Sequence, residues 1–197
     1  MTAPAFKPNL NVEYKFVLKG ALAARFDRAA LQPFAWSPEP ASAWPAWPDL
    51  RAWCLAGWLD APLAVAFHEC GDRALARVSA LALELDGSVL LHQSRSGLDR
   101  ALLRARAKWQ DLRPGAHRPA TAIWDSGFVP HQGQALTALA RFEPRRPTFI
   151  VLQDFSAAEL ERALSSLRAR SKDFRCPVRI LILGDPSPPE SCFYIPA

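Results

Sequence analysis

The stretch from Thr148 to Pro186, TFIVLQDFSAAELERALSSLRARSKDFRCPVRILILGDP, decides the fold class. It contains two mainly apolar stretches, FIVL and RILIL, separated by a segment of helical period. Ser156 followed three residues later by Glu159 is a capping box that starts a helix, and the buried stripe of that helix is Leu160, Leu164 and Leu167. Continuous apolar strands joined by a helix are typical of a parallel sheet that is covered on both faces.

The residues before this stretch predict the rest of the domain. TAIWD at 121–125 has the composition of a strand, and HQGQALTALARF at 131–142 has that of a helix. Residues 63–93 show alternation and two turn signals, GD and DG, which predict an antiparallel meander. We therefore expect a three-layer α/β domain over 62–197, with a mixed sheet in which the meander precedes a parallel βαβαβ part.

Residues 1–61 predict an N-terminal strand, a helix and a Trp/Pro-rich extension packed on the core. Five of the seven tryptophans lie in this extension, among several prolines that fix the backbone as an irregular loop. The tryptophans could cover the strands as a lid, stack on nucleic-acid bases or form a groove for a protein partner.

Composition narrows the class of protein. The chain has 197 residues, of which 50% are hydrophobic, so it can bury a sizeable core. It contains no apolar run long enough to span a bilayer, no secretory signal pattern and no cysteine spacing of a metal site. We expect a cytoplasmic protein with reduced thiols and, from the Ala/Arg/Pro-rich usage, a bacterial one.

A basic helix is expected from Ser96 onward. Its apolar stripe is Leu98, Leu102, Ala105, Trp109 and Leu112, and its basic residues are Arg100, Arg104, Arg106 and Lys108. The segment from Arg95 to Arg118 holds seven basic and two acidic residues, a difference of five that equals the net charge of +5. Such a segment predicts contacts with nucleic-acid phosphates, the alternative being an ordinary solvated face.

The sequence TAIWDSGFVPHQGQALTALARF at 121–142 resembles a phosphate-binding loop between a strand and a helix. Gly127 and Gly133 are one residue too far apart for the usual pattern, and Gln134 occupies the lysine position. We predict a ligand loop without phosphate-loop chemistry, or a plain strand-to-helix turn. Its residues are Gly127, His131, Gly133, Gln134 and, from a later strand end, Asp185.

Two strand ends resemble nucleotide hydrolases. Asp154 follows FIVLQ, where RecA-like and helicase enzymes place a magnesium-binding acid, and Gly184-Asp185-Pro186 is similar to a strand motif of superfamily 1 helicases. This resemblance implies Mg²⁺-dependent nucleotide hydrolysis, although Phe155 replaces a second acid. The predicted strand order also resembles RNase H-like nucleases, which implies a two-metal site from Glu84 or Asp86 with Asp125 and Asp154.

Three functions follow from these patterns. The first is a non-catalytic or degenerate-site protein that binds nucleic acid or a nucleoprotein assembly through the basic helix. The second is a metal-dependent nuclease or nucleotide phosphohydrolase with Asp125 and Asp154 as catalytic residues and Mg²⁺ as the cofactor. The third is a protein–protein adaptor that uses the Trp/Pro-rich surface.

Overall fold

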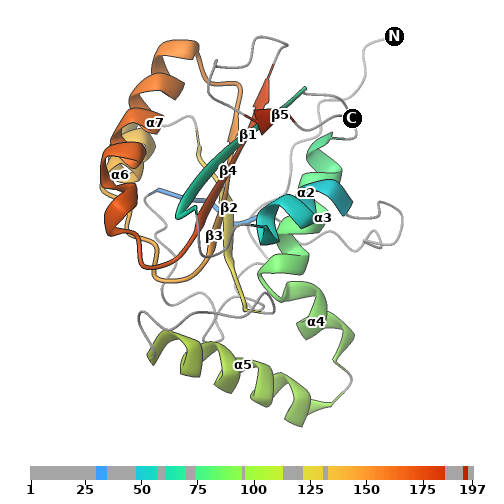
Figure 1. Ribbon diagram of the computed structural model, residues 1–197. Helices are drawn as coiled ribbons and strands as arrows, with labels where there is room; N and C mark the ends of the chain where they lie inside the picture. Colours follow the sequence, from blue (N-terminus) through green and yellow to red (C-terminus); the bar gives the residue numbers. More distant parts are fainter. Residues whose placement is uncertain are drawn as a thin grey trace, which may run out of the picture.

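The computed structural model describes residues 30–34, 48–56, 61–69, 74–94, 96–112, 122–130, 133–184 and 193–194. Within them a parallel sheet lies between two groups of helices (Figure 1). The helices are α2 (Pro48–Leu55), α3 (Ala74–Leu85), α4 (Ser88–Gln93), α5 (Gly97–Leu112), α6 (Gly133–Ala140), α7 (Ala157–Arg170) and the 3₁₀ turn η3 (Ser171–Asp173). The strands are β1 (Leu63–Glu69), β2 (Asp125–Phe128), β3 (Thr148–Gln153), β4 (Val178–Gly184) and β5 (Phe193–Tyr194).

The strand order is β2-β3-β4-β1-β5, and every pair in it is parallel. Val178 at the start of β4 is in register with Leu63 of β1 on one side and with Thr148 of β3 on the other. The short edge strand β2 begins level with them, because Asp125 pairs with Thr148. The predicted α/β class is confirmed, whereas the predicted mixed sheet is wrong.

The error lies in residues 74–93, which form helices α3 and α4 and not meander strands. The buried side chains of α3 include Val78, Leu81, Ala82 and Leu85, which follow the i, i+3, i+4, i+7 spacing of a helix. Ala, Leu, Arg and Glu are also strong helix formers, so the short alternation in LALEL was misleading. With helices in place of the expected strands over 74–93, β1 pairs with β4.

The Asp86-Gly87 pair starts a helix and does not turn a hairpin. Gly87 has φ of 79°, in the left-handed region that suits glycine. Ser88 N donates to Asp86 Oδ1 at 2.8 Å, which satisfies one of the free N–H groups at the start of α4. The chain therefore passes from α3 into α4 with only a short break.

Two apolar clusters form the core, one on each face of the sheet. On one face α6 and α7 supply Ala135, Leu139, Leu160, Ala163, Leu164 and Leu167, which pack on Ile150, Leu152, Val178, Ile180 and Ile182. On the other face α2 and α3 supply Leu50, Cys54, Val78, Leu81, Ala82 and Leu85, which pack on Trp124, Phe149, Val151, Leu181 and Leu183. The two clusters give the three layers that the apolar strands predicted.

Most other predicted elements from residue 63 onward are present, namely the strand at 63–69, the basic helix, the helix after Pro130 and the stretch from β3 to β4. The strand predicted at 121–125 was misplaced, because β2 runs from Asp125 to Phe128. The capping box of α7 is complete, since Ser156 Oγ accepts from Glu159 N and Glu159 Oε2 accepts from Ser156 N at 3.0 Å.

Residues 1–61 are described only over 30–34 and 48–56. Gln32 forms an antiparallel bridge with Phe128 at the outer side of β2, and α2 packs on the core through Leu50 and Cys54. The predicted Trp/Pro-rich loop lies outside the described residues, and the division at residue 61 stays a prediction. Over the described part of the chain, no helix combines the length and the apolar character that crossing a membrane requires.

Candidate functional site

The basic helix is α5, and Figure 1 shows it below the sheet, beyond the edge at which β2 begins. Arg100, Arg104, Arg106 and Lys108 are all exposed on it. Arg100 Nε donates to the carbonyl oxygen of Ser94 at 3.1 Å, which ties the first turn of α5 to the end of α4. Between Arg100 and Lys108 the sequence has no acidic residue, so the local field at this surface is positive.

The apolar stripe of α5 does not pack on the core as expected. Leu98, Leu102 and Trp109 are exposed to 76%, 68% and 57%, whereas Ala107 is fully buried and Leu103 is partly buried. Leu103 lines a groove with residues of α4. The more apolar side of α5 faces solvent.

The two predicted catalytic aspartates lie at opposite ends of the parallel strands, one at the amino edge of the sheet and the other at the carboxyl edge. Asp125 is the first residue of β2 and pairs with Thr148, whereas Asp154 follows the last residue of β3. Six residues of strand separate Thr148 from Asp154, which is about 20 Å at 3.3 Å per residue. One metal centre cannot hold both carboxylates, so the predicted site that joins Asp125 to Asp154 does not form.

The acids expected from the RNase H-like order are not assembled either. Glu84 lies on α3, where its Oε1 is 2.7 Å from Arg51 Nε on α2. Asp86 lies near Asp125, at the end of the sheet where α4 begins. Asp154 lies at the opposite end of the strands. The parallel sheet lacks the antiparallel strands that this resemblance requires.

Asp154 by itself lies at the edge where parallel sheets usually bind ligands. Its side chain is exposed, its φ is 58°, and Gln153 Nε2 donates to its Oδ2 at 3.0 Å. Gly184 ends the neighbouring strand β4 at this same edge. Asp185 follows Gly184 in the chain but lies outside the described residues.

The predicted ligand loop joins β2 to α6 at the outer strand of the sheet. Gly127 lies inside β2 and is buried, so it is not part of an open loop. Gly133 and Gln134 begin α6, and the structure does not describe the Gln134 side chain or any of His131. The strand–loop–helix topology of the prediction is confirmed, and its role in ligand binding stays a prediction.

The connections at the carboxyl edge of the sheet are described only in part. β3 leads into α7 on one face, whereas α3, the next helix after β1, lies on the other face. Residues 185–192, which follow β4 at this edge, lie outside the described residues. The four residues that join β1 to α3, Cys70 to Arg73, lie outside the described residues, and their sequence has one glycine and no lysine.

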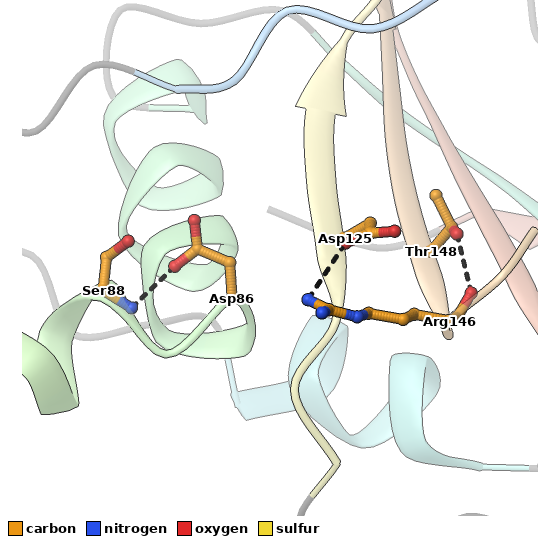
Figure 2. A network of polar contacts seen from close by, with 5 residues as sticks. All are labelled: Asp86, Ser88, Asp125, Arg146 and Thr148. Atoms are coloured by element: carbon orange, nitrogen blue, oxygen red, sulfur yellow. Dashed lines mark hydrogen bonds and ion pairs between the residues drawn. The ribbon is translucent and has the colours of Figure 1, made fainter. Parts of the chain in front are cut away.

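A buried polar cluster lies at the amino edge of the sheet (Figure 2). Arg146 precedes β3 and is 1% exposed, and its Nη1 is 3.6 Å from Asp125 Oδ1. Thr148 Oγ1 donates to the carbonyl oxygen of Arg146 at 2.9 Å. Asp86 and Ser88 lie across from this pair, at the break between α3 and α4, and bond to each other. The ion pair therefore joins the starts of β2 and β3, and Asp86 lies near enough to Asp125 to be affected by its charge.

The surroundings perturb the protonation of Asp86. Burial raises the pKa of its carboxyl group to about 7, hydrogen bonds from Ser88 lower it, and the charge of Asp125 raises it further. The group therefore changes charge near neutral pH.

Sequence reasoning missed the two buried arginines. Arg146 is buried next to the exposed Arg145, and nothing in the run PRRP distinguishes the two. Arg179 lies on β4 and donates from Nη1 to Ala61 O and from Nη2 to Ala56 O, both at 2.9 Å. Its place inside an apolar strand was the available signal, since a buried arginine needs several acceptors.

The described residues contain no group of three or more His, Cys, Asp or Glu side chains that could hold a metal ion. Comparison with protein-family models, with curated proteins and with solved structures found no match.

Proposed function

We propose that this protein binds nucleic acid through the basic face of α5. The observation that carries the proposal is the set of four exposed cations within nine residues of one helix, with no acid among them. Arg100, Arg104 and Lys108 repeat at i, i+4 and i+8, which places them along one side of the helix. A row of this kind can follow the spacing of successive phosphates.

The position of α5 favours contact with a large polyanion. The helix lies beyond the amino edge of the sheet, where its outer surface is not enclosed by the described strands (Figure 1). The exposed Trp109 on the same helix adds an aromatic surface of the type that stacks on bases. Backbone contacts of this kind give affinity with little sequence preference.

The test is fluorescence anisotropy of labelled single- and double-stranded DNA and RNA, from low to physiological salt. The logarithm of the binding constant should fall linearly with the logarithm of salt concentration, with a slope of about −2 to −3 if the row of Arg100, Arg104 and Lys108 neutralises three phosphates. The variant Arg100→Ala/Arg104→Ala/Lys108→Ala should lose most of the affinity and most of the salt slope.

A matched control separates the helix from the net charge. Arg141→Ala/Lys172→Ala/Arg175→Ala removes three exposed cations on the α6 and α7 side and changes the charge by the same amount. Its affinity should stay within a few fold of the wild type. Equal losses in both variants, or no binding at low salt, would refute the proposal.

A second candidate is a phosphohydrolase site at Asp154, because this exposed carboxylate stands at the carboxyl edge in an uncommon backbone conformation. Asp is one of the few residues that tolerate this conformation, so the geometry is compatible with a plain turn. Magnesium-dependent release of phosphate from a nucleoside triphosphate, lost in EDTA and in Asp154→Asn, would support it. Absence of release at every magnesium concentration would exclude it.

A further inference from the structure

Few buried side chains hold α4 to the rest of the described protein. Of its residues only Ser88 is buried, and Val89 adds a partly buried contact with the core. Gly87 separates α4 from α3 in the left-handed conformation, with a φ of 79°. Residues at the end of an element often serve as hinges, and a segment with little buried apolar surface opens locally at low cost. The break between α3 and α4 is therefore a place where the chain can open while the sheet stays folded.

The break packs against the chain that enters β2. Trp124 N donates to the carbonyl oxygen of Leu85, the last residue of α3, at 2.9 Å. The Ile123 side chain lies next to the glycine of the break. On the α4 side, Ser88 N donates to Asp86 Oδ1 at 2.8 Å. The amides of Trp124 and Ser88 therefore keep these hydrogen bonds as long as the break is closed.

Three charged groups lie beside the break (Figure 2). Asp86 is near Asp125 of β2, and Asp125 Oδ1 is 3.6 Å from Nη1 of Arg146, the buried arginine before β3. With Asp86 protonated, the charges of one carboxylate and one guanidinium balance. Ionisation of Asp86 adds a second carboxylate to the same confined place, where water screens the repulsion between like charges only weakly.

The other charged side chains described on α3 and α4 are Glu84, Arg77 and His92. Glu84 Oε1 is 2.7 Å from Arg51 Nε of α2, whereas Arg77 is near the start of α3 and His92 is in the last turn of α4. Asp86 is therefore the titratable group at the break itself. It is partly exposed, so its proton exchanges with solvent while the protein is folded.

The ionised form of Asp86 is disfavoured in the closed break. Burial raises the pKa of its carboxyl group to about 7, although hydrogen bonds from Ser88 favour the anion. In an open break water would solvate this carboxylate and remove most of the cost of its charge. Opening and ionisation of Asp86 therefore favour each other.

We propose that Asp86 is a pH-sensitive switch that opens and closes the break between α3 and α4. Protonated Asp86 keeps α4 against the start of β2. Ionised Asp86 favours an open break, in which α4 turns about Gly87 and water reaches both carboxylates. Because Arg100 Nε donates to the carbonyl oxygen of Ser94 at 3.1 Å, the first turn of α5 moves with α4. The switch does not depend on nucleic-acid binding by α5.

Amide hydrogen exchange on the full chain, followed by NMR from pH 5 to pH 8, tests the switch. Protection is taken relative to an unstructured chain at the same pH. The open state releases the Asp86 proton at a lower pH than the closed state, so its population should rise with pH and level off above about pH 7. The rise is at most about a hundredfold, because about two units of the pKa difference lie above pH 5. Since Asp86 is partly exposed, protection of the Ser88 and Trp124 amides should fall by about 5- to 30-fold.

Urea separates this local opening from unfolding of the whole domain. Opening of the break exposes little surface, so exchange at Ser88 and Trp124 should not change at low urea concentration, whereas exchange through global unfolding accelerates. Val129 N, which donates to the carbonyl oxygen of Val151 at 3.0 Å beyond the other end of β2, is the internal reference and should follow global unfolding. If Ser88 and Trp124 share the protection and the urea dependence of Val129, the break does not open by itself and the proposal is overturned.

Two variants assign the effect to Asp86. Asp86→Asn keeps an acceptor for Ser88 N but carries no charge, so protection of both amides should be the same at pH 5 and pH 8. Glu84→Gln, the matched control, removes one negative charge two residues earlier on α3 and should retain the pH dependence of the wild type. Unchanged protection across the pH range in the wild type, or pH dependence that persists in Asp86→Asn, would overturn the proposal.

Discussion

Replacing Asp86 with Asn should stabilise the protein, and the gain should grow as the pH rises. Burial is the main reason that the pKa of the Asp86 carboxyl group rises from 3.8 to about 7 in the folded protein. Asp86 Oδ1 accepts a hydrogen bond from Ser88 N at 2.8 Å. An asparagine side chain keeps an oxygen that can accept the same bond but carries no charge. The substitution therefore retains the start of α4 and removes the cost of burying an anion.

The sign follows from which state holds the proton. The unfolded chain releases the Asp86 proton near pH 4, whereas the folded protein keeps it until about pH 7. Between these values the folded state binds more protons than the unfolded state, so the free energy of unfolding decreases as the pH rises. The loss is complete above about pH 7 and absent below about pH 4.

The size of the effect is set by the same shift. Each pKa unit corresponds to 1.36 kcal/mol, so a shift of about three units bounds the whole cost at about 4 kcal/mol. About two of these units lie above pH 5, which gives an upper limit of about 3 kcal/mol between pH 5 and pH 8. Asp86 is partly exposed, so we expect about 1–2 kcal/mol over this interval.

Urea unfolding of the wild type and Asp86→Asn at about pH 5 and about pH 8 measures this difference directly. The gain from the substitution should be larger at the higher pH by the amount given above. Asp173→Asn, which neutralises an exposed acid in η3, is the control and should behave alike at both values. An equal gain at both pH values, or a loss of stability at pH 8, would show that the carboxyl group is not held protonated by its surroundings.

Three further predictions concern single side chains. Arg179→Ala should destabilise the fold by about 2–5 kcal/mol in chemical denaturation, because it removes the donors to Ala56 O and Ala61 O and leaves a cavity. Arg179→Lys should restore only part of the lost stability, since one ammonium group cannot replace the planar guanidinium. Full restoration by lysine would contradict the role assigned to the guanidinium. Ser156→Ala should cost about 1 kcal/mol through loss of the α7 cap, and an unchanged unfolding midpoint would count against the capping box. Burial raises the pKa of the Cys54 thiol to about 12. Mass spectrometry should therefore find Cys54 unmodified by iodoacetamide at neutral pH until the protein is unfolded. Rapid labelling of the native state would contradict the packing of α2.

The elements that the sequence predicted correctly are those with a strong local signal. The strand before Asp154 contains a continuous apolar run, the strand before Asp185 is apolar apart from Arg179, and the helix between them carries its own capping box. The basic helix was visible from its period and its charges. Each of these signals is local, because caps and side-chain period act within one or two turns of the chain.

The prediction of strands at residues 74–93 was wrong because a short alternation of apolar and polar residues fits both a strand and one face of a helix. Burial decided the outcome, since the side chains of α3 that pack on β2 and its neighbours are spaced for a helix. That choice also changed the sheet, because β1 found its partner in β4, more than a hundred residues later in the chain. A pairing over such a distance leaves no mark in a local pattern.

The sequence by itself determined the α/β class, the parallel strands β3 and β4, the helix between them and the charge of α5. Only the tertiary structure decided that Asp125 and Asp154 stand at opposite edges, that Arg146 and Arg179 are buried and that the apolar stripe of α5 faces outward. The physical reason is the range of the interactions. Backbone capping and helical period are set by neighbours in sequence, whereas edge position and burial depend on which strand pairs with which.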